Sequence, residues 1–295
     1  MNPGKRRDFF MTMEHTTIAI QGFEGSFHHV AATKYFGRKA HVLPCISFQD
    51  VINTTQSGAC TFGLMAIENS IAGSILPNYN QLHRSKLFIA GEIYLQINQN
   101  LIANKGVTLN DLKEVHSHHM ALQQCLQYLE LYKWKLVESE DTALSAKLIH
   151  QHRSKHIAAI GSTLAAELYG LDILAPSIQT MKNNYTRFLV LQKQQTTTAD
   201  ATKASLCFQT DHSKGSLAKV LNMIADADIN LSKLQSFPIP GSQFSYRFHA
   251  DMEFDDIRQF EKALTDMSAH TESIRVYGIY ENGKKKLRLK NQTSA

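Results

Sequence analysis

The sequence has few cysteines and no long hydrophobic run. Its four cysteines, Cys45, Cys60, Cys125 and Cys207, are scattered along 295 residues without the paired spacing of a disulfide framework. No apolar stretch approaches the length of a membrane span, and the charged N-terminal stretch lacks the apolar segment of a signal peptide. We therefore expect reduced thiols, a cytoplasmic location and no membrane partner.

The sequence also lacks the features that bind metal ions or nucleic acids. His116, His118, His119 and Cys125 lie close together, but adjacent histidines at a helix start converge poorly, and no second ligand pair has metal spacing. Helix capping or contact with a polar substrate explains them better, so we expect no metal. The net charge of +5 comes partly from basic tails, and no interior motif is suited to reading bases. We therefore expect no nucleic-acid partner.

The glycine turn at residues 22–26 is too short for a dinucleotide fingerprint. That motif needs a third glycine, and Glu24 would repel a pyrophosphate. The turn joins a strand predicted over residues 17–20 to a helix, so N–H groups around Gly25 and Ser26 are available to a carboxylate. A purely structural tight turn explains the segment equally well.

The chain does contain the alternating strands and helices of an α/β protein. A hydrophobic fraction of 43% and a charged fraction of 19% are those of an ordinary soluble globular protein. Short apolar strands alternate with helix starts, for example at Ser47 and Asp141, which indicates a parallel, layered architecture. The partly alternating segment at residues 87–103 is typical of a strand that crosses from one lobe to another.

Polar side chains stand where several of these strands end and helices begin. Glu68, Asn69 and Ser70 follow an apolar strand, at the edge where α/β sheets bind ligands. Ser117 opens a segment that becomes an amphipathic helix, and Asp141 with the next residue opens another helix. Helix caps and strand-to-helix turns are the alternative explanation for these residues.

The segment at residues 183–188 places a hydroxyl and a guanidinium at the start of a buried strand. Thr186 and Arg187 precede an apolar run at residues 189–191. Such a position suits binding a carboxylate and acting on the group beside it. A polar turn that enters an ordinary strand is the alternative.

A different pattern follows the polar linker at residues 193–202. Strand, helix, strand, strand, helix and strand follow one another across residues 203–282, which predicts the ferredoxin-like βαββαβ plan. Residues 1–16 are predicted to form a disordered extension and residues 283–295 a basic tail.

Six motifs in order, followed by this domain, resemble the bacterial prephenate dehydratases that carry a C-terminal ACT domain. The motifs are Gly22-Phe23-Glu24-Gly25-Ser26-Phe27, Ile67-Glu68-Asn69-Ser70, Ser117-His118 with Gln124-Cys125, Asp141-Thr142-Ala143, Ala165-Ala166-Glu167-Leu168-Tyr169-Gly170-Leu171 and Asn184-Tyr185-Thr186-Arg187-Phe188. The similarity runs from about residue 17 to residue 280.

The resemblance implies a two-lobed α/β catalytic domain at residues 17–192, similar to periplasmic binding proteins, before a ferredoxin-like ACT domain at residues 203–282. It implies conversion of prephenate to phenylpyruvate in L-phenylalanine biosynthesis, without a cofactor. Thr186 is then catalytic, Arg187 orients a carboxylate or braces the site, and Phe188 excludes water. The substrate-binding residues that the resemblance implies are Gly25, Ser26, Glu68, Asn69, Ser70, Ser117, Gln124 and Thr142.

Two alternatives accompany this interpretation. Arogenate dehydratases perform the same chemistry on the amino-acid analogue of prephenate. A noncatalytic amino-acid sensor built on the same two-lobed plan is the alternative from another class of protein.

The sequence departs from the family's motifs at two places. Ala66 replaces a frequent proline, and His119-Met120 replaces a frequent Pro-Gln, but both changes leave the polar groups in place.

The ACT resemblance also implies feedback by L-phenylalanine at a subunit interface of a homodimer or homotetramer. The family's Glu-Ser-Arg-Pro motif is Gln235-Ser236-Phe237-Pro238 here, so both of its charges are missing. A purely structural, dimerising domain is the alternative. The effector residues that the resemblance implies are Gly215, Ser216, Leu217, Asn230, Leu231, Gln235 and Ser236.

Overall fold

The computed structural model describes residues 16–239, 241–242 and 245–284. The extension predicted for residues 1–16 and the tail predicted for residues 283–295 lie outside these residues, apart from Thr16, Gly283 and Lys284. Contacts between Cα atoms divide the chain into two compact units. Unit 1 comprises Met1–Met65, Asn69–Ala72 and Leu95–Thr186, and unit 2 comprises Ala66–Glu68, Gly73–Tyr94 and Arg187–Ala295. No helix in the described ranges has the length and apolarity needed to cross a bilayer.

The first sheet has the strand order β2-β1-β3-β11-β5, with the short β4 paired to β3. Its strands are β1 (Thr17–Gln21), β2 (His41–Cys45), β3 (Phe62–Asn69), β4 (Gly73–Ser74), β5 (Phe88–Gln96) and β11 (Tyr185–Gln192). The intervening helices are α1 (Phe27–Phe36), α2 (Phe48–Ser57) and α3 (Leu76–Arg84). β1 pairs in parallel with β2 and β3, and Ser47 caps α2 as predicted. The apolar run of β3 is buried, as expected for a strand covered on both faces.

The second sheet has the order β10-β6-β9-β7-β8. Its elements are β6 (Asn100–Ala103), the short 3-10 helix η2 (Leu109–Asp111), β7 (Glu114–His118), α4 (His119–Gln124), α5 (Leu126–Leu129), β8 (Lys135–Ser139), α6 (Thr142–Gln151), β9 (Ile157–Gly161), α7 (Thr163–Tyr169) and β10 (Asp172–Ala175). β7 pairs in parallel with β8 and β9, but β6 pairs antiparallel with β9 and β10. The predicted parallel pairing is therefore confirmed for β7, β8 and β9 and wrong for β6 and β10. The predicted crossing segment is confirmed, since β5 belongs to the first sheet and β6 to the second.

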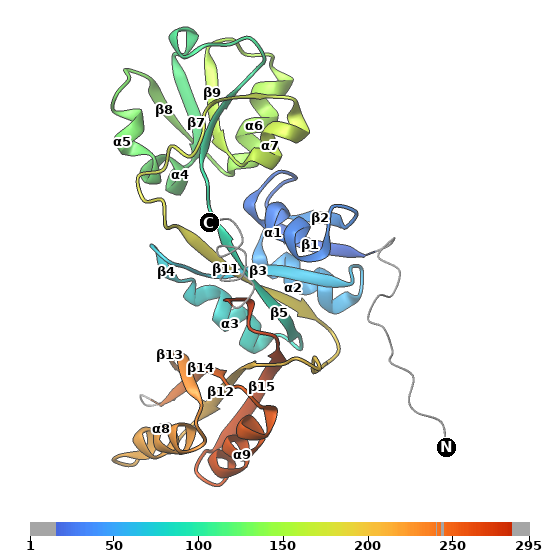
Figure 1. Ribbon diagram of the computed structural model, residues 1–295, viewed down its shortest axis with the longest axis vertical. Helices are drawn as coiled ribbons and strands as arrows, with labels where there is room; N and C mark the ends of the chain where they lie inside the picture. The colour runs from blue at the N-terminus through green and yellow to red at the C-terminus, as the bar shows by residue number, and fades with distance from the viewer. Residues whose placement is uncertain (1–15, 240, 243–244, 285–295) are drawn as a thin grey trace. The chain divides into compact units, whose positions relative to one another are not determined.

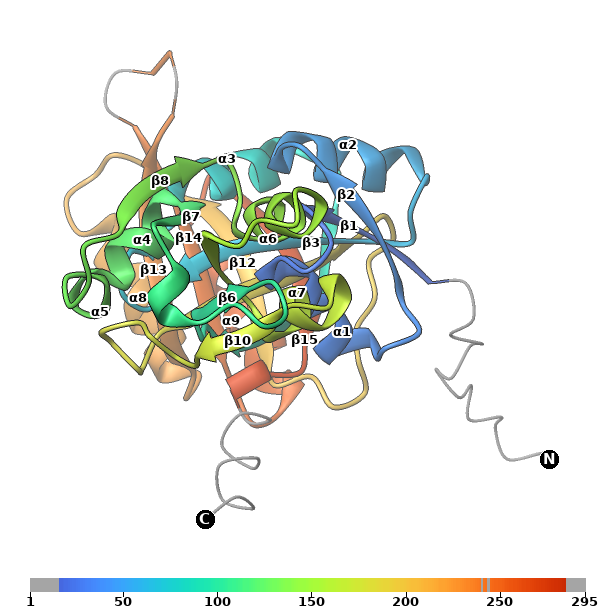
Figure 2. The ribbon, with the colours of Figure 1, turned by 90° about the horizontal axis from the view of Figure 1, so that it is seen from above.

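Alternating side chains give the second sheet a core on each face. Leu101 and Ile160 pack with α4 and α5, whereas Ile102 and Ala159 pack with α6 and α7. This alternation follows from the two-residue period of a strand. Helices α6 and α7 lie side by side, and α4 and α5 cover the opposite face (Figures 1 and 2).

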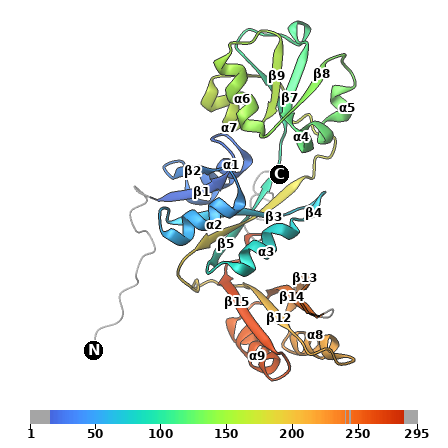
Figure 3. The same cartoon turned by 180° about the vertical axis from the view of Figure 1, so that it is seen from behind.

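The C-terminal part of unit 2 is a βαββαβ structure, as predicted. It consists of β12 (Lys203–Gln209), α8 (Ser216–Asp226), β13 (Asn230–Pro238), β14 (Tyr246–Glu253), α9 (Ile257–Ser268) and β15 (Ser273–Tyr280). The four strands form an antiparallel sheet with the order β13-β14-β12-β15, which we call the C-terminal sheet. Both helices cover one of its faces (Figure 3), around a core that includes Leu206, Ile224 and Phe260.

Candidate active site

Asn69 and Thr186 form the central hydrogen bond of the candidate site. Asn69 ends β3, Thr186 is the second residue of β11, and the two strands are neighbours in the first sheet. Asn69 Nδ2 donates to Thr186 Oγ1 at 3.0 Å. Asn69 Oδ1 accepts the backbone N–H groups of Ile71 at 3.0 Å and Ala72 at 2.9 Å, which fixes the orientation of the amide. The Thr186 oxygen is therefore an acceptor in this bond, so its own O–H is left to donate.

A chain of side-chain amides extends from this bond. Asn69 Nδ2 also donates to Asn184 Oδ1 at 2.7 Å, and Asn184 Nδ2 donates to Gln124 Oε1 at 3.1 Å. Gln99 Nε2 lies 3.4 Å from the same Gln124 oxygen. Asn184 is fully buried, so these bonds hold its amide in one orientation. The structure thus brings Asn69, Gln124 and Thr186 together as predicted site residues, through Asn184, whose role the sequence pattern alone did not reveal.

Ser70 joins the two segments that carry Asn69 and Thr186. Its Oγ donates to the carbonyl of Asn183 at 3.2 Å and accepts the N–H of Tyr185 at 2.9 Å. Its backbone N–H donates to the Tyr185 carbonyl at 2.8 Å. Ser70 therefore makes backbone contacts that place the residues preceding Thr186, which fits a structural role better than the predicted contact with substrate.

The glycine turn uses its N–H groups internally. The N–H of Gly25 donates to His29 Nδ1 at 3.1 Å, and the N–H of His29 donates to Ser26 Oγ at 3.3 Å. Ser162 Oγ donates to the Gly25 carbonyl at 2.6 Å, which joins the turn to the start of α7. The structural alternative therefore describes Gly25 and Ser26 better than the predicted carboxylate site. Gly25 has φ +89°, and a Cβ there would lie 2.9 Å from Ala165 Cα.

Ser117 lies in β7, one residue before the end of the strand, and Thr142 lies at the start of α6. Ser117 is fully buried, and its Oγ donates to the Ile160 carbonyl at 2.8 Å, so this hydroxyl is engaged within the sheet. Thr142 is the first residue of α6 and is 9% exposed. His118, at the end of β7, caps α4, so helix capping, one of the two explanations offered for the clustered histidines, describes His118. In the ranges that the structure describes, no group of three or more His, Cys, Asp or Glu residues is arranged to hold a metal ion.

Asp141 is a candidate that the sequence pattern indicated only as a helix start. Its Oδ1 accepts the N–H groups of Ala143 at 2.7 Å and Leu144 at 3.0 Å. Its other oxygen, Oδ2, lies 2.8 Å from the point where a Cβ at Gly22 would stand. Burial raises the pKa of Asp141 despite these bonds. Asp141 is therefore a carboxylate with a raised pKa beside the glycine turn, which makes it a candidate for a functional role.

The guanidinium of Arg187 is engaged by protein groups. It is 4% exposed, and its Nε donates to Glu92 Oε2 at 2.6 Å. One terminal nitrogen donates to Asp251 and the other to the Tyr280 hydroxyl at 3.2 Å. The fork of the guanidinium is therefore occupied by protein groups. Of the two predicted roles, bracing agrees with this geometry and substrate binding does not.

Phe188 and Glu68 also have partners or surroundings within the protein. Phe188 is 1% exposed, so its ring belongs to the buried run of β11. Glu68 Oε1 accepts a hydrogen bond from Lys233 Nζ at 2.5 Å, and the same ammonium donates to Ser74 Oγ at 2.5 Å. Lys233 therefore neutralises the Glu68 carboxylate, and the predicted contact of Glu68 with substrate stays a prediction.

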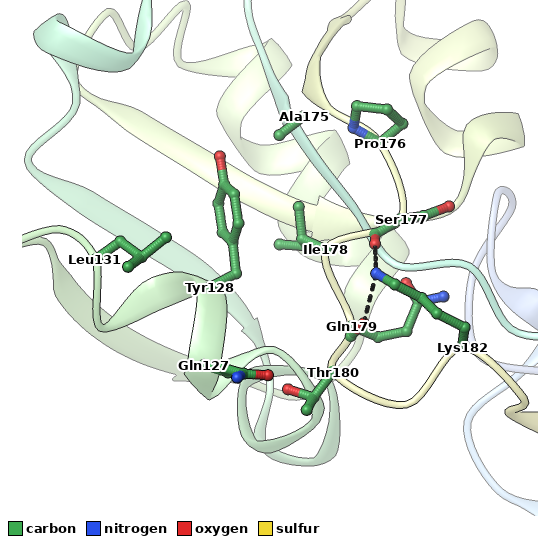
Figure 4. A pocket seen from close by; sticks show the side chains of 10 residues that line it. All are labelled: Gln127, Tyr128, Leu131, Ala175, Pro176, Ser177, Ile178, Gln179, Thr180 and Lys182. Atoms are coloured by element: carbon green, nitrogen blue, oxygen red, sulfur yellow. Dashed lines mark hydrogen bonds between the residues drawn. The ribbon is translucent and has the colours of Figure 1, made fainter.

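Two cavities of the described residues have walls that include neither Asn69 nor Thr186. One, of about 500 Å³, lies in unit 1 between α5 and residues 175–182 (Figure 4). Its wall includes Tyr128 and Lys182, and Lys182 Nζ donates to the Gln179 carbonyl at 2.8 Å. The other, of about 510 Å³, lies in unit 2 and includes Asn230 and Glu253. Thr186 lines neither cavity, so volume alone does not locate the chemistry.

The predicted effector residues occupy both ends of α8. Gly215 caps the helix with φ +81°, and Ser216 Oγ donates to the Asp211 carbonyl at 2.9 Å. Asn230 follows the other end of this helix. The 11 residues of α8, at a rise of about 1.5 Å each, separate the two ends of the helix by roughly 15 Å. One chain therefore does not place Leu217 beside Asn230, because α8 separates them.

The other predicted effector residues lie along β13 or in the core. Leu217 and Leu231 pack against the core of the C-terminal sheet. Gln235 Nε2 donates to the Ser236 carbonyl at 3.2 Å, near the far end of β13. Since β13 returns antiparallel to α8, this pair lies at the same end of the domain as Gly215.

Comparisons with known proteins agree with the family resemblance seen in the sequence. A sequence profile described as prephenate dehydratase matches residues 18–196. The bifunctional chorismate mutase/prephenate dehydratase of Enterobacter agglomerans is 31% identical over 270 residues, which cover 89% of this chain and 70% of that protein. The chloroplastic arogenate dehydratase/prephenate dehydratase 1 of Arabidopsis thaliana is 34% identical over 281 residues, with 89% and 71% covered.

Solved structures give the same match over nearly the whole chain. The prephenate dehydratase of Arthrobacter aurescens in complex with L-Phe has a TM-score of 0.81 and 24% identity, with 92% of this chain and 91% of that chain covered. The prephenate dehydratase of Staphylococcus aureus has a TM-score of 0.78 and 28% identity, with 90% and 100% covered. GqqA, described as a novel type of quorum-quenching acylase, has a TM-score of 0.82 and 28% identity, with 90% and 97% covered.

Proposed function

The chain belongs to the prephenate dehydratase family, and we propose that Thr186 assists the departing hydroxyl in the conversion of prephenate to phenylpyruvate. The ring of prephenate becomes aromatic once it loses its carboxyl group and its hydroxyl. The electron pair of the breaking bond to carbon dioxide enters the ring as the bond to the hydroxyl breaks, and the hydroxyl leaves as water after it gains a proton. No redox partner is needed, so the site must orient the substrate and assist one leaving group.

The hydrogen bond from Asn69 to Thr186 is the observation that carries this proposal. Because the Thr186 oxygen accepts from Asn69 Nδ2 at 3.0 Å, its own O–H remains available to donate to a substrate oxygen. Accepting a hydrogen bond also polarises the O–H group and makes it a better donor. A threonine hydroxyl is a weak acid, so polarisation of the leaving hydroxyl or relay of a proton is its role, and full ionisation is not required.

The amide chain supports a preorganised site. Asn184 and Gln124 fix the orientation of Asn69, so Thr186 needs no rearrangement when the substrate arrives. The relation to a described quorum-quenching acylase shows that this fold also occurs in proteins with other described activities, and fold alone does not define chemistry. The Asn69–Thr186 bond is therefore the better guide to the reaction.

Replacement of one hydroxyl tests the proposal. Thr186→Val removes the O–H but keeps the shape of the side chain, and Asn69 Nδ2 retains Asn184 as an acceptor. We expect kcat to fall about 10²- to 10⁴-fold, with a much smaller change in KM. Thr186→Ser keeps the hydroxyl and serves as the matched control. Near-normal kcat in a folded Thr186→Val enzyme contradicts the proposal, and parallel assays with arogenate measure the preference between the two substrates.

We also propose that the C-terminal domain binds L-phenylalanine between subunits of a homodimer or homotetramer. The L-Phe complex described for the Arthrobacter aurescens protein supports this assignment. Gly215 and the Gln235–Ser236 pair lie at one end of the domain, and a second subunit would supply the remaining contacts. Calorimetric titration with L-phenylalanine should release or absorb heat and lower prephenate turnover. An absence of both effects would favour a structural, dimerising domain.

A further inference from the structure

Lys233 joins the C-terminal sheet to the residue that precedes Asn69. Lys233 lies on β13, and its Nζ donates to Glu68 Oε1 and to Ser74 Oγ, each at 2.5 Å. The side chains of Lys233 and Glu68 are 13% and 33% exposed, so solvent screens this ion pair only partly. Lys233 also lies over the Tyr79 ring, 5.7 Å from its centroid. We call the contact of Lys233 with Glu68 and Ser74 the Lys233 tether.

A second contact joins the same sheet to the residue that follows Thr186. Asp251 on β14 accepts a hydrogen bond from Arg187, and Tyr280 on β15 accepts another at 3.2 Å. Asp251 also accepts from Ser205 Oγ, so the sheet itself holds the carboxylate in place. Arg187 and Asp251 are 4% and 0% exposed. We call the contact of Arg187 with Asp251 and Tyr280 the Asp251 tether.

We propose that Lys233 and Asp251 are positioning residues for the Asn69–Thr186 pair. One tether holds the residue before Asn69, and the other holds the residue after Thr186. A single antiparallel sheet carries both tethers, so it fixes the distance between Glu68 and Arg187. Because these residues adjoin Asn69 and Thr186, the sheet also fixes the geometry of the hydrogen bond between that pair. Neither residue touches the reacting groups. This inference rests on the proposed role of Thr186, and it adds that the C-terminal sheet is part of what orients the active site.

The rate of catalysis is sensitive to the position of the reacting groups. A displacement of about 1 Å at a reacting group can cost roughly 10²-fold in rate. Ion pairs placed only for stability would change the unfolding free energy and leave kcat of the folded enzyme unchanged. A positioning role instead lowers kcat while KM stays nearly constant, because the tethers do not contact the substrate.

The Lys233→Met variant is the first test, because Lys233 is not fully buried and this variant is the one expected to fold. It keeps the aliphatic part of the side chain but loses the ammonium. We expect kcat for prephenate to fall about two- to tenfold, with little change in KM, as for residues that couple to a site without touching it. Lys233→Arg should restore most of kcat, because it retains the charge and the donors.

Lys219→Met is the matched control, because Lys219 is an exposed lysine on α8 of the same domain. It should leave kcat and KM unchanged. In a Thr186→Val background, Lys233→Met should have no further effect on kcat, because the group that it positions is gone. An equal loss in both backgrounds would overturn the proposal, and so would an unchanged kcat in folded Lys233→Met.

Hydrogen exchange provides a readout that does not depend on activity. The N–H groups of Ile71 and Ala72 donate to Asn69 Oδ1, so their exchange reports how firmly Asn69 is held. Lys233→Met should accelerate exchange of these two amides relative to wild type and to Lys219→Met. Unchanged exchange there would overturn the inference. Failure of the wild-type enzyme to convert prephenate would instead refute the proposed function, and the exchange result would still decide whether Lys233 holds Asn69.

Discussion

Replacing Arg187 with methionine distinguishes a brace from a substrate-binding residue. Arg187 and Lys203 are the cations of a buried cluster in unit 2, and Glu92 and Asp251 are its carboxylates. These four charges sum to zero. Burial by itself would raise the pKa of Asp251, but Arg187, with help from His249 and Lys203, holds that pKa well below its ordinary value. Arg187→Met leaves two carboxylates facing one ammonium.

The expected loss of folding stability in Arg187→Met follows from this charge balance. Removing one partner of a buried ion pair typically costs about 3–5 kcal/mol, because the remaining charge stays buried and unpaired. This loss is a large part of the roughly 5–15 kcal/mol that stabilises most folded proteins. The double variant Arg187→Met/Asp251→Asn retains Lys203 and Glu92, whose charges cancel. We therefore expect it to be destabilised by less than the sum of the single variants, with a difference of about 1–3 kcal/mol.

Urea unfolding and steady-state kinetics together test this reasoning. The single variants should unfold at lower urea concentrations than wild type, and KM for prephenate should stay within about twofold because protein groups already engage the Arg187 guanidinium. Their kcat should fall, since Arg187 adjoins Thr186. Two results would refute the reasoning: strict additivity of the two substitutions, or a stable Arg187→Met enzyme whose KM has risen by about tenfold or more.

Two further predictions concern the glycine turn and a half-buried histidine. Gly25→Ala should lower kcat/KM at least tenfold, because the φ of +89° and the 2.9 Å approach to Ala165 both exclude a Cβ. Gly73→Ala, at φ +83° without any atom within 4 Å, isolates the backbone cost as a control in the same assay. Burial, with help from nearby arginines, lowers the pKa of His83 to about 4, below the ordinary value of 6.5. The unfolded chain therefore takes up the proton first as pH falls, so stability is lost from about pH 6.5 to about pH 4, and His83→Gln should flatten the fall in melting temperature over that range.

Local signals explain which parts of the fold the sequence predicted well. Ser47, Asp141 and Asp256 cap helices that begin at the following residue. Each cap is a contact between residues two or three positions apart, so its pattern is visible in a short window of sequence. The βαββαβ order was predictable for the same reason, because periodicity and turn residues mark each of its elements.

Contacts between distant residues explain what the sequence did not reveal. Arg187 and Asp251 are 64 positions apart, and Lys233 and Glu68 are 165 apart. Neither pair produces a periodic pattern, and a charged residue beside a catalytic one looks the same whether it meets the substrate or the protein. The antiparallel pairing of β6 could not be predicted either, because a short apolar run does not reveal in which direction the neighbouring strands run.

The pleat of a β-strand explains why adjacent residues of one motif have different tasks. Successive side chains of a strand point to opposite faces, so Glu68 and Asn69 point apart in β3, and Thr186 and Arg187 point apart in β11. In each strand one residue joins the Asn69–Thr186 bond, and its neighbour joins the C-terminal sheet. A strand is stiff over two residues, so holding Glu68 and Arg187 also limits the motion of Asn69 and Thr186. With the roles proposed above, the Thr-Arg-Phe sequence combines a group for the chemistry, Thr186, with a neighbour, Arg187, that holds it in place.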